Sequence, residues 1–293
     1  MDIIKAIASE LNVRNNQVEA AVKLIDEGCT IPFISRYRKE ATGALNDEQL
    51  RNLDERLKYL RNLEDKKAQV IASIAEQGLL TDELKNQIEK ADTMVAVEDL
   101  YRPYRPKRRT RATIAKEKGL EPLANIIMLQ MTGEPVVKTA EEYVSEEKDV
   151  KTPEDAVAGA KDIIAESISD NADYRTRIRE LTFKEGVLTS AAKDAEAKTV
   201  YEMYYNFSEP AAKMAGHRIL AVNRGENEKI LTVKIEAPVD KILAYLEKQI
   251  IVRDNRYTTG IIKEAIEDSY ERLIAPSIER EIRNQLTETA EAG

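Results

Sequence analysis

Apolar residues recur along most of this chain at the three- and four-residue spacing of an amphipathic helix. Asp2 precedes a first apolar stripe, a second stripe ends at Gly28, and a third helix is expected from about Pro32. Asn46 and Gln49 then form a capping box ahead of regularly spaced leucines, which predicts one helix of about thirty residues. Three short helices also match the outline of a helix-turn-helix unit, but we interpret them as helices that pack within the chain.

Helical patterns continue through the middle of the chain. Thr81 and Thr93 each precede a further helical pattern, and Thr110 or Thr113 opens another, which is stopped by Gly119. Residues 133–152 are acidic and weakly patterned. This composition predicts either a boundary between modules or a mobile connection.

A second helix-turn-helix candidate follows this acidic stretch. Helical patterns cover residues 153–168 and 171–184, and a two-residue turn joins them. The later helix would carry Arg175, Arg177 and Arg179 on its surface, either solvated or paired with neighbouring glutamates. An Arg cluster of this kind does not by itself indicate a DNA contact.

Period-two alternation appears in one stretch of the sequence. HRILAVN and KILTVKIE alternate β-branched and polar residues, and residues 224–228 separate them, so we expect a β-hairpin near residues 217–236. The final pattern, from residue 260 onward, is helical and interrupted by Pro276. The predicted fold class is mainly α, multihelical, with an inserted helix-turn-helix-like unit and one small β-hairpin.

Composition narrows the class of protein. The chain has 293 residues, of which 42% are hydrophobic, a length that suggests about two domains. A single cysteine, Cys29, excludes an internal disulfide, and a single histidine, His217, leaves no His/Cys metal site. No apolar run approaches ~18 residues and no signal peptide is visible, so a cytoplasmic protein without a membrane partner is expected.

The sequence offers little for catalysis. It lacks the Gly-rich phosphate loop, the HExxH motif, the GxSxG motif and a cysteine cluster. Neighbouring carboxylates such as Glu98 and Asp99 point to different sides of a helix and do not converge on a metal ion or a water. We therefore expect no enzymatic activity, no cofactor and no metal site.

The densest chemical signal is a basic segment, defined here as residues 101–118. It carries eight Lys/Arg against one Glu in a chain whose net charge is −8. It would bind phosphates, with Tyr101 and Tyr104 stacking on bases. The cations that would follow the backbone are Arg102, Arg105, Lys107, Arg108, Arg109 and Arg111. Alternatively, the same cations anchor an irregular crossing to acidic helices or dock a further domain, and the sequence leaves both interpretations open.

Four long segments also resemble a known family. They are IPFISRYRKEATGALNDEQL at 31–50, EDLYRPYRPKRRTRATIAKEKGLEPLA at 98–124, HRILAVNRGE at 217–226 and EDSYERLIAPSIEREIRNQLTE at 267–288. They are similar, in the same order, to the Tex family of bacterial transcription accessory proteins. The resemblance implies an N-terminal region that is followed in longer members by a YqgF-type ribonuclease H-like domain, helix-hairpin-helix units and an RNA-binding OB-fold domain.

The resemblance also implies an organisation and a function. A helical body would occupy 1–123 and 201–293, with a helix-turn-helix-like unit inserted at 124–200, an architecture shared with the core of a eukaryotic transcription elongation factor. The expected function is sequence-nonspecific binding of RNA or DNA through the basic segment. The alternative is a scaffold that positions the downstream RNA-binding domains of the same protein and contacts the transcription apparatus.

Overall fold

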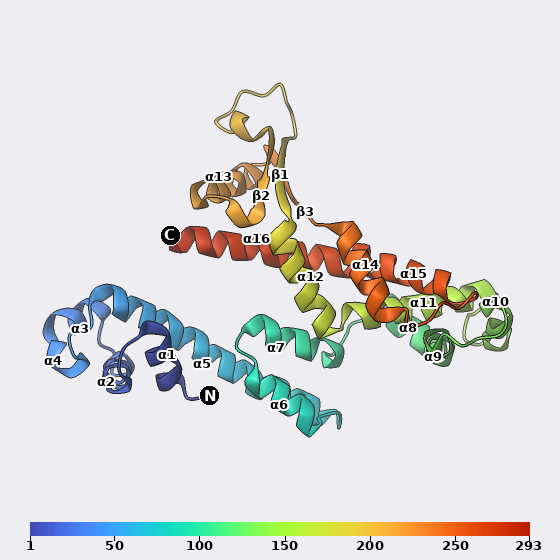
Figure 1. Ribbon diagram of the computed structural model, residues 1–293, viewed down its shortest axis with the longest axis horizontal. Coiled ribbons are helices and arrows are strands. Elements are labelled where there is room, and N and C mark those ends of the chain that lie inside the picture. Colours follow the sequence, from blue (N-terminus) through green and yellow to red (C-terminus); the bar gives the residue numbers. More distant parts are fainter. The chain divides into compact units, whose positions relative to one another are not determined.

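The computed structural model describes residues 1–293, and their contacts divide the chain into two compact units, Met1–Tyr104 and Arg105–Gly293. Helices dominate both units, and the strands of one small sheet lie in the second unit (Figure 1). The prediction of a mainly α fold is therefore confirmed.

The first unit is built entirely from helices. They are α1 (Ile3–Leu11), α2 (Asn15–Asp26), α3 (Ile31–Tyr37), α4 (Lys39–Thr42), α5 (Asp47–Glu76), α6 (Asp82–Lys90), α7 (Met94–Tyr101) and the 3-10 turn η1 (Arg102–Tyr104). The predicted capping box is present at the start of α5. The Asn46 side chain accepts from the Gln49 N–H at 2.8 Å, and the Gln49 side chain accepts from the Asn46 N–H at 3.0 Å. Both contacts satisfy N–H groups that lack a partner within the helix, and the prediction of a thirty-residue helix is confirmed.

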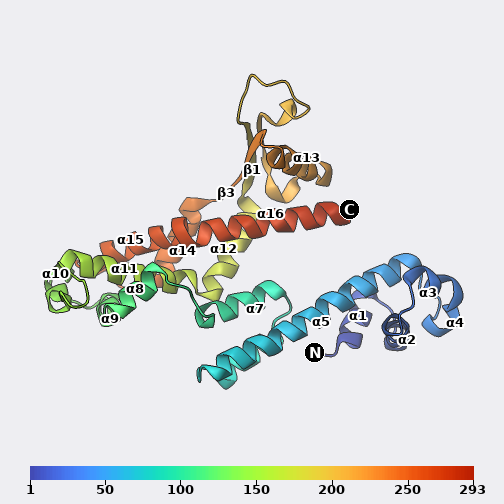
Figure 2. The same ribbon diagram turned by 180° about the vertical axis from the view of Figure 1, so that it is seen from behind.

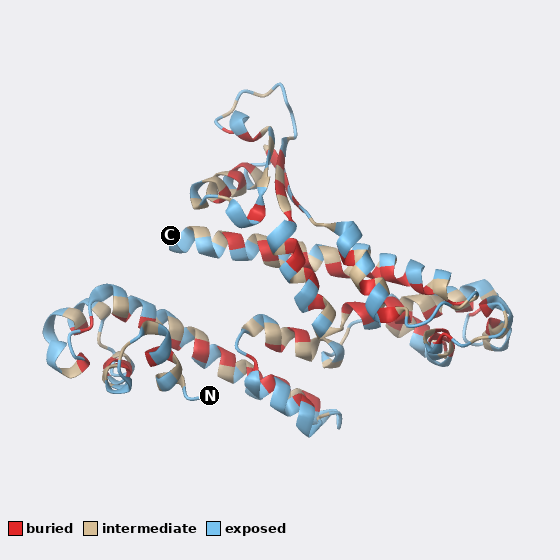
Figure 3. Cartoon of the chain, viewed as in Figure 1, coloured by how far each residue is buried: buried red, intermediate tan, exposed pale blue.

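The α5 helix organises the core of the first unit. Its buried face recurs every three or four residues, and α1, α2, α3, α6 and α7 all contact α5 (Figure 3). The buried leucines of this face are Leu50, Leu53, Leu57, Leu60 and Leu63. Burying one such side chain stabilises a fold by roughly 1.5–3 kcal/mol, so this stripe is what holds the short helices in place.

Several helices of the second unit pack on α11. The helices of this unit are α8 (Arg111–Glu117), α9 (Glu121–Leu129), α10 (Val136–Thr139), α11 (Pro153–Ser169), α12 (Ala172–Glu185), α13 (Gly216–Asn227), α14 (Val239–Ile250), α15 (Thr259–Asp268) and α16 (Ala275–Ala292). Short turns are η2 (Ala140–Tyr143), η3 (Glu202–Tyr204) and η4 (Ala211–Lys213). The α11 helix contacts α8, α9 and α15. A π-helical segment, Ser269–Ile274, joins α15 to α16 without a break, and Pro276, which has no N–H to donate, follows it in the first turn of α16.

The β-hairpin predicted near 217–236 is wrong. Residues 217–223 belong to α13, whereas β3 (Leu231–Glu236) pairs antiparallel with β1 (Val187–Ala192), and β1 also pairs with β2 (Asn206–Pro210). The strand order is β2-β1-β3. The error arose because a short apolar run can fit the period of a helix or that of a strand. Here Ile219 and Val222 form a helical stripe that packs on β3 and α16. Figure 2 shows α13 beside the sheet from the opposite side.

The acidic stretch 133–152 is ordered rather than a mobile connection. It contains α10 and η2, and a β-bridge joins Ser145 to Val150. Val136, Ala140 and Val150 are at most 3% exposed and belong to the core of the second unit. Three apolar anchors therefore fix a segment that composition alone classified as irregular.

The structural division of the chain differs from the predicted boundaries. Along the chain, the first unit ends at Tyr104 and the second begins at Arg105. The predicted boundaries at 123/124 and 200/201 both fall inside the second unit. One apolar core runs from Ala112 to Leu286 through residues on both sides of those boundaries. That the 124–200 segment is an inserted helix-turn-helix-like unit stays a prediction.

We expect Gly186→Ala to lower the free energy of unfolding by about 2 kcal/mol. A Cβ at this position would lie 2.2 Å from the Thr182 carbonyl oxygen and 3.2 Å from Ile235 Cγ2, and a backbone oxygen cannot move aside freely. The measurement is urea denaturation followed by circular dichroism. Gly260→Ala is the matched control, because a Cβ there meets nothing within 4 Å, and it should be neutral or mildly stabilising within α15. Equal stability of both variants would contradict the steric argument.

Candidate nucleic-acid interface

The basic segment spans the division between the two units. Tyr101, Arg102 and Tyr104 belong to the first unit, at the end of α7 and in η1. The segment enters the second unit at Arg105 and runs as an irregular stretch into α8, whose first residue is Arg111. The cations that were predicted to act together are therefore divided between the two units: Arg102 belongs to the first unit and the others belong to the second.

The first-unit members of the segment are built into that unit. The Tyr101 hydroxyl lies 2.9 Å from Ser73 Oγ on α5, and the Lys66 ammonium lies 5.8 Å from the Tyr101 ring centre. The Tyr104 carbonyl accepts from Gln77 Nε2 at 2.8 Å. Both tyrosine rings are half-buried against the apolar core, and Arg102 Nε is buried without a hydrogen-bond partner. These contacts assign the two tyrosines to packing in the first unit.

Lys107 is held by two carboxylates. Its ammonium donates to Asp170 at the end of α11 and lies 3.5 Å from a Glu166 oxygen on the same helix. The three side chains are only 22%, 13% and 15% exposed for Lys107, Asp170 and Glu166. Sequence reasoning missed both carboxylates, because they lie 59 and 63 residues away and no local pattern links them to Lys107. Lys107 therefore anchors the irregular stretch to α11.

The remaining arginines of the segment lie on the surface. Arg105, Arg108, Arg109 and Arg111 are all exposed. Arg109 has a contact of 3.2 Å to Glu117, in which both side chains are more than half exposed, and a pair of this kind holds a cation weakly. Arg108 has no ion pair or hydrogen bond in the structure. These four arginines occupy seven consecutive positions and are the part of the segment that can reach a phosphate.

A cleft of about 400 Å³ opens beside Arg111, between α8 and α11. Its charged lining is mixed, and comprises Arg111, Lys118, Lys151, Asp149, Asp155 and Asp162. Burial raises the pKa of Asp162, an effect that the nearby Arg272 and Arg111 guanidinium groups oppose. Hydrogen bonds from Arg272 lower the pKa of Asp268, and the charge of Arg111 contributes to the same effect. Arg111 therefore faces acidic neighbours on one side, which weakens its attraction for a phosphate relative to Arg108.

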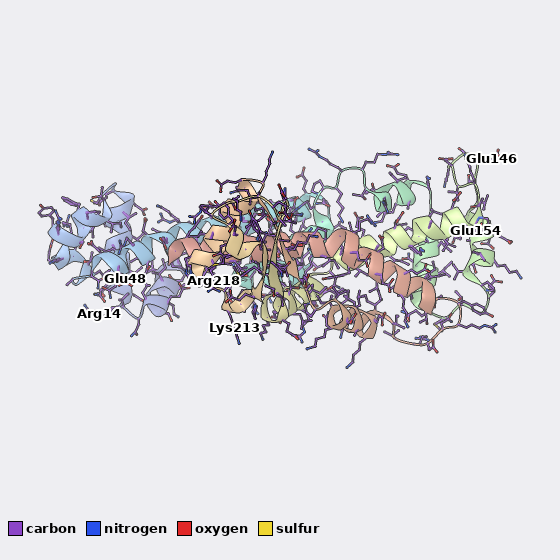
Figure 4. The ribbon with its side chains drawn as sticks, turned by 90° about the horizontal axis from the view of Figure 1, so that it is seen from above. Arg14, Glu48, Glu146, Glu154, Lys213 and Arg218 are labelled. Atoms are coloured by element: carbon purple, nitrogen blue, oxygen red, sulfur yellow. The ribbon has the colours of Figure 1, made fainter.

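Acidic side chains gather at one end of the second unit. Glu146, which precedes α11, and Glu154, in its first turn, extend from that end (Figure 4). Both residues are exposed. Such a surface repels a phosphate backbone.

The predicted surface cluster on α12 is only partly on the surface. Arg175 is 1% exposed, and it donates to the Ser169 carbonyl and to Ser277 Oγ on α16. Arg179 contacts Glu281 at 2.7 Å, and Arg177 lies 3.6 Å from Glu180. The expectation that Arg175 projects from the helix is wrong, because α12 packs this face against α16. The expected pairing with glutamates is confirmed for the other two arginines.

Side chains that could bind a metal ion do not gather beside these cations. The structure holds no group of three or more His, Cys, Asp or Glu side chains placed to bind a metal ion. His217 is exposed in the first turn of α13, rather than at the start of a strand as predicted, and Cys29 is a free thiol. None of the helices combines the length and the apolar character that crossing a bilayer requires.

Comparison with known proteins gives two matches to family descriptions. Residues 1–75 match the Tex-like protein N-terminal domain, and residues 132–293 match the Tex central region-like family. The second match covers more than half of the chain.

Individual proteins are similar over nearly the whole chain. Uncharacterized protein YdcI of Bacillus subtilis is 52% identical over 288 residues, which cover 97% of this chain and 40% of that protein. Transcriptional accessory protein Tex of Neisseria gonorrhoeae is 38% identical over 301 residues, or 99% and 39%. S1 RNA-binding domain-containing protein 1 of Homo sapiens is 29% identical over 309 residues, or 99% and 30%. The chain thus spans about two fifths or less of the length of these relatives.

Proposed function

This chain belongs to the Tex family, and from that premise we propose that it contributes to nucleic-acid binding by presenting exposed arginines to a phosphate backbone. The arginines are Arg105, Arg108, Arg109 and Arg111. The observation that carries the proposal is their exposure within seven residues, while Lys107 in their midst is held by α11. A fixed lysine restrains the stretch, so that less conformational entropy is lost when the arginines bind.

The binding is expected to be independent of nucleotide sequence. Arginine contacts to phosphate oxygens position a partner without reading its bases. The name of the human relative refers to RNA binding, and that of the gonococcal relative to transcription. Both names support a nucleic acid as the partner. The role proposed for this chain is non-catalytic, and the proposed location is cytoplasmic.

A second candidate function rests on the anchored members of the segment. Lys107 is fixed to α11, and Tyr101 and Tyr104 are packed in the first unit. These contacts favour a scaffold, in which the basic segment stabilises the helices that it contacts. The chain would then position other domains of the protein or contact the transcription apparatus. Binding measurements distinguish the two functions.

We expect the triple variant Arg108→Ala, Arg109→Ala and Arg111→Ala to flatten the salt dependence of nucleic-acid binding. Each lost phosphate contact removes about 0.9 from the slope of log affinity against log salt on duplex DNA and about 0.7 on single strands, so three contacts lower its magnitude by roughly 2 to 3. The measurement is fluorescence anisotropy with labelled duplex DNA and single-stranded RNA at several salt concentrations.

The matched control is Arg177→Ala, which removes an exposed, loosely paired arginine from α12. It should leave the slope unchanged. If the triple variant keeps the wild-type slope and its melting temperature falls, the phosphate contacts are ruled out and the scaffold is favoured.

A further inference from the structure

The first unit exposes two aromatic rings side by side. Of the 12 Tyr and 3 Phe in the chain, Phe33 and Tyr37 are the exposed ones, at 43% and 65%. Their ring centres lie 5.4 Å apart on α3, with the ring planes inclined at 47°. Every other aromatic side chain is at least half-buried or takes part in a core. The pair thus differs in its exposure from all other aromatic residues of the chain.

The α3 helix itself explains why the rings point outward. Thr30 caps the helix, Ile34 is fully buried, and Ile31 packs against the core of the first unit. Phe33 and Tyr37 are one helical turn apart, so their rings lie on one face of the helix, and both rings are exposed. In this short helix Ile31 and Ile34 therefore pack on the core of the first unit, whereas the rings of Phe33 and Tyr37 are exposed.

Positive charge surrounds the exposed rings. Arg36 lies three positions from Phe33, so its side chain emerges beside that of Phe33 on the surface of α3. Lys39 follows in α4, and neither cation has an ion pair or hydrogen bond in the structure. Arg14 is also exposed and lies against Gly43 at the end of α4.

Carboxylates do not cancel this charge. Residues 31–43 carry three cations and one carboxylate, Glu40, which Arg38 already holds at 3.1 Å. Glu48, in the first turn of α5, is exposed on the same side of the first unit as Arg14 (Figure 4). The face around the rings therefore keeps two cations, Arg36 and Lys39, that no acidic residue neutralises.

We propose that Phe33 and Tyr37, together with Arg36 and Lys39, form a binding site for single-stranded nucleic acid in the first unit. The rings stack on unpaired bases and the two cations contact the flanking phosphates, which is how proteins bind single strands without sequence preference. A duplex fits poorly, because its bases are already stacked on one another. The site is separate from the arginines of the second unit, and its existence does not depend on phosphate binding there.

The first test compares ring-removing and ring-preserving substitutions in the full 293-residue chain. The double variant Phe33→Ala and Tyr37→Ala is expected to bind a labelled 12-nucleotide oligouridine at least tenfold more weakly than the wild type, because each lost stacking contact weakens binding by roughly tenfold. Tyr37→Phe retains a ring and should bind as the wild type does. Both rings are exposed, so the melting temperature of the double variant should change little.

The salt dependence separates this site from the one proposed above. Removing the rings should lower affinity by a similar factor at every salt concentration, whereas removing Arg108, Arg109 and Arg111 should change the slope. If the arginine variant has no effect and the ring variant does, the first proposal fails and this one stands. The reverse outcome overturns the stacking site alone.

A second test uses the absence of tryptophan from the chain. Tyr37→Trp introduces a single indole at the platform, and its fluorescence should be quenched when oligouridine is added and a base stacks on it. Val200→Trp is the matched control, because Val200 is 88% exposed and lies in the second unit, outside both sites. An unquenched indole at position 37, together with unchanged affinity of the double alanine variant, would overturn the proposal and favour a protein partner for this face.

Discussion

Arg175→Ala is expected to lower the free energy of unfolding by about 4 kcal/mol, the largest effect of any single substitution considered for this chain. Arg175 is 1% exposed and is the largest of the fully buried side chains. Its guanidinium donates to the Ser169 carbonyl, where α11 ends, and at 2.7 Å to Ser277 Oγ on α16. Alanine would leave a cavity and a buried carbonyl without a donor, and both changes are costly.

Three further variants separate these contributions. Arg175→Met restores most of the volume without the N–H donors, so it should recover part of the loss. Ser277→Ala removes one hydrogen-bond partner and should cost about 1–2 kcal/mol. Arg177→Ala, two positions along α12, removes a side chain that is 48% exposed and should cost less than about 0.5 kcal/mol. Urea denaturation measures all four variants, and equal stability of Arg175→Ala and Arg177→Ala would show that the buried contacts are unimportant.

Replacing Lys107 is expected to destabilise the second unit by about 3 kcal/mol without changing the salt dependence of nucleic-acid binding. Lys107→Ala removes a cation that contacts both Asp170 and Glu166, which are 13% and 15% exposed, and removing one partner of a largely buried ion pair is strongly unfavourable. Lys107→Glu should be worse still, because three carboxylates would then meet at one point. The measurements are the melting temperature and the binding slope of the same preparations.

A surface lysine provides the control for this prediction. Lys241 contacts Glu185 at 2.5 Å, but its side chain is 65% exposed, and Lys241→Ala should cost less than about 1 kcal/mol. The comparison holds the type of ion pair constant and varies its burial. A flatter binding slope for Lys107→Ala with unchanged stability would instead place Lys107 among the phosphate contacts. That result would contradict its role as an anchor on α11.

Local features of the fold were predictable because their causes are local. The helix Asp47–Glu76 follows from Asn46 and Gln49 at its start and from leucines at helical spacing along its length. Thr81, Thr93 and Thr110 each cap the helix that was predicted to follow them. In all of these cases the residues that decide the structure lie within a few positions of one another.

The sheet was not predictable in the same way. The central strand β1 pairs with β3, which lies about forty residues later in the sequence and beyond α13. Gly225 in α13 lets that helix approach β3, since a Cβ there would lie 2.4 Å from Leu231 Cδ1. The residues HRILAVN fit a strand or a helix equally well, and the packing partner decided between them. Long-range contacts of this kind leave no periodic signal in the sequence.

The candidate site likewise depends partly on local sequence and partly on long-range contacts. The sequence by itself determined where positive charge is concentrated, because eight Lys/Arg fall within residues 101–118, and it also determined the helical class of the fold. Tertiary structure alone decided which of those cations remain available. Lys107 meets two carboxylates of α11, Tyr101 meets Ser73 of α5, and Arg108 meets none of the acidic side chains. The charge of a residue is a property of its side chain, whereas its partner is set by which distant helix packs beside it.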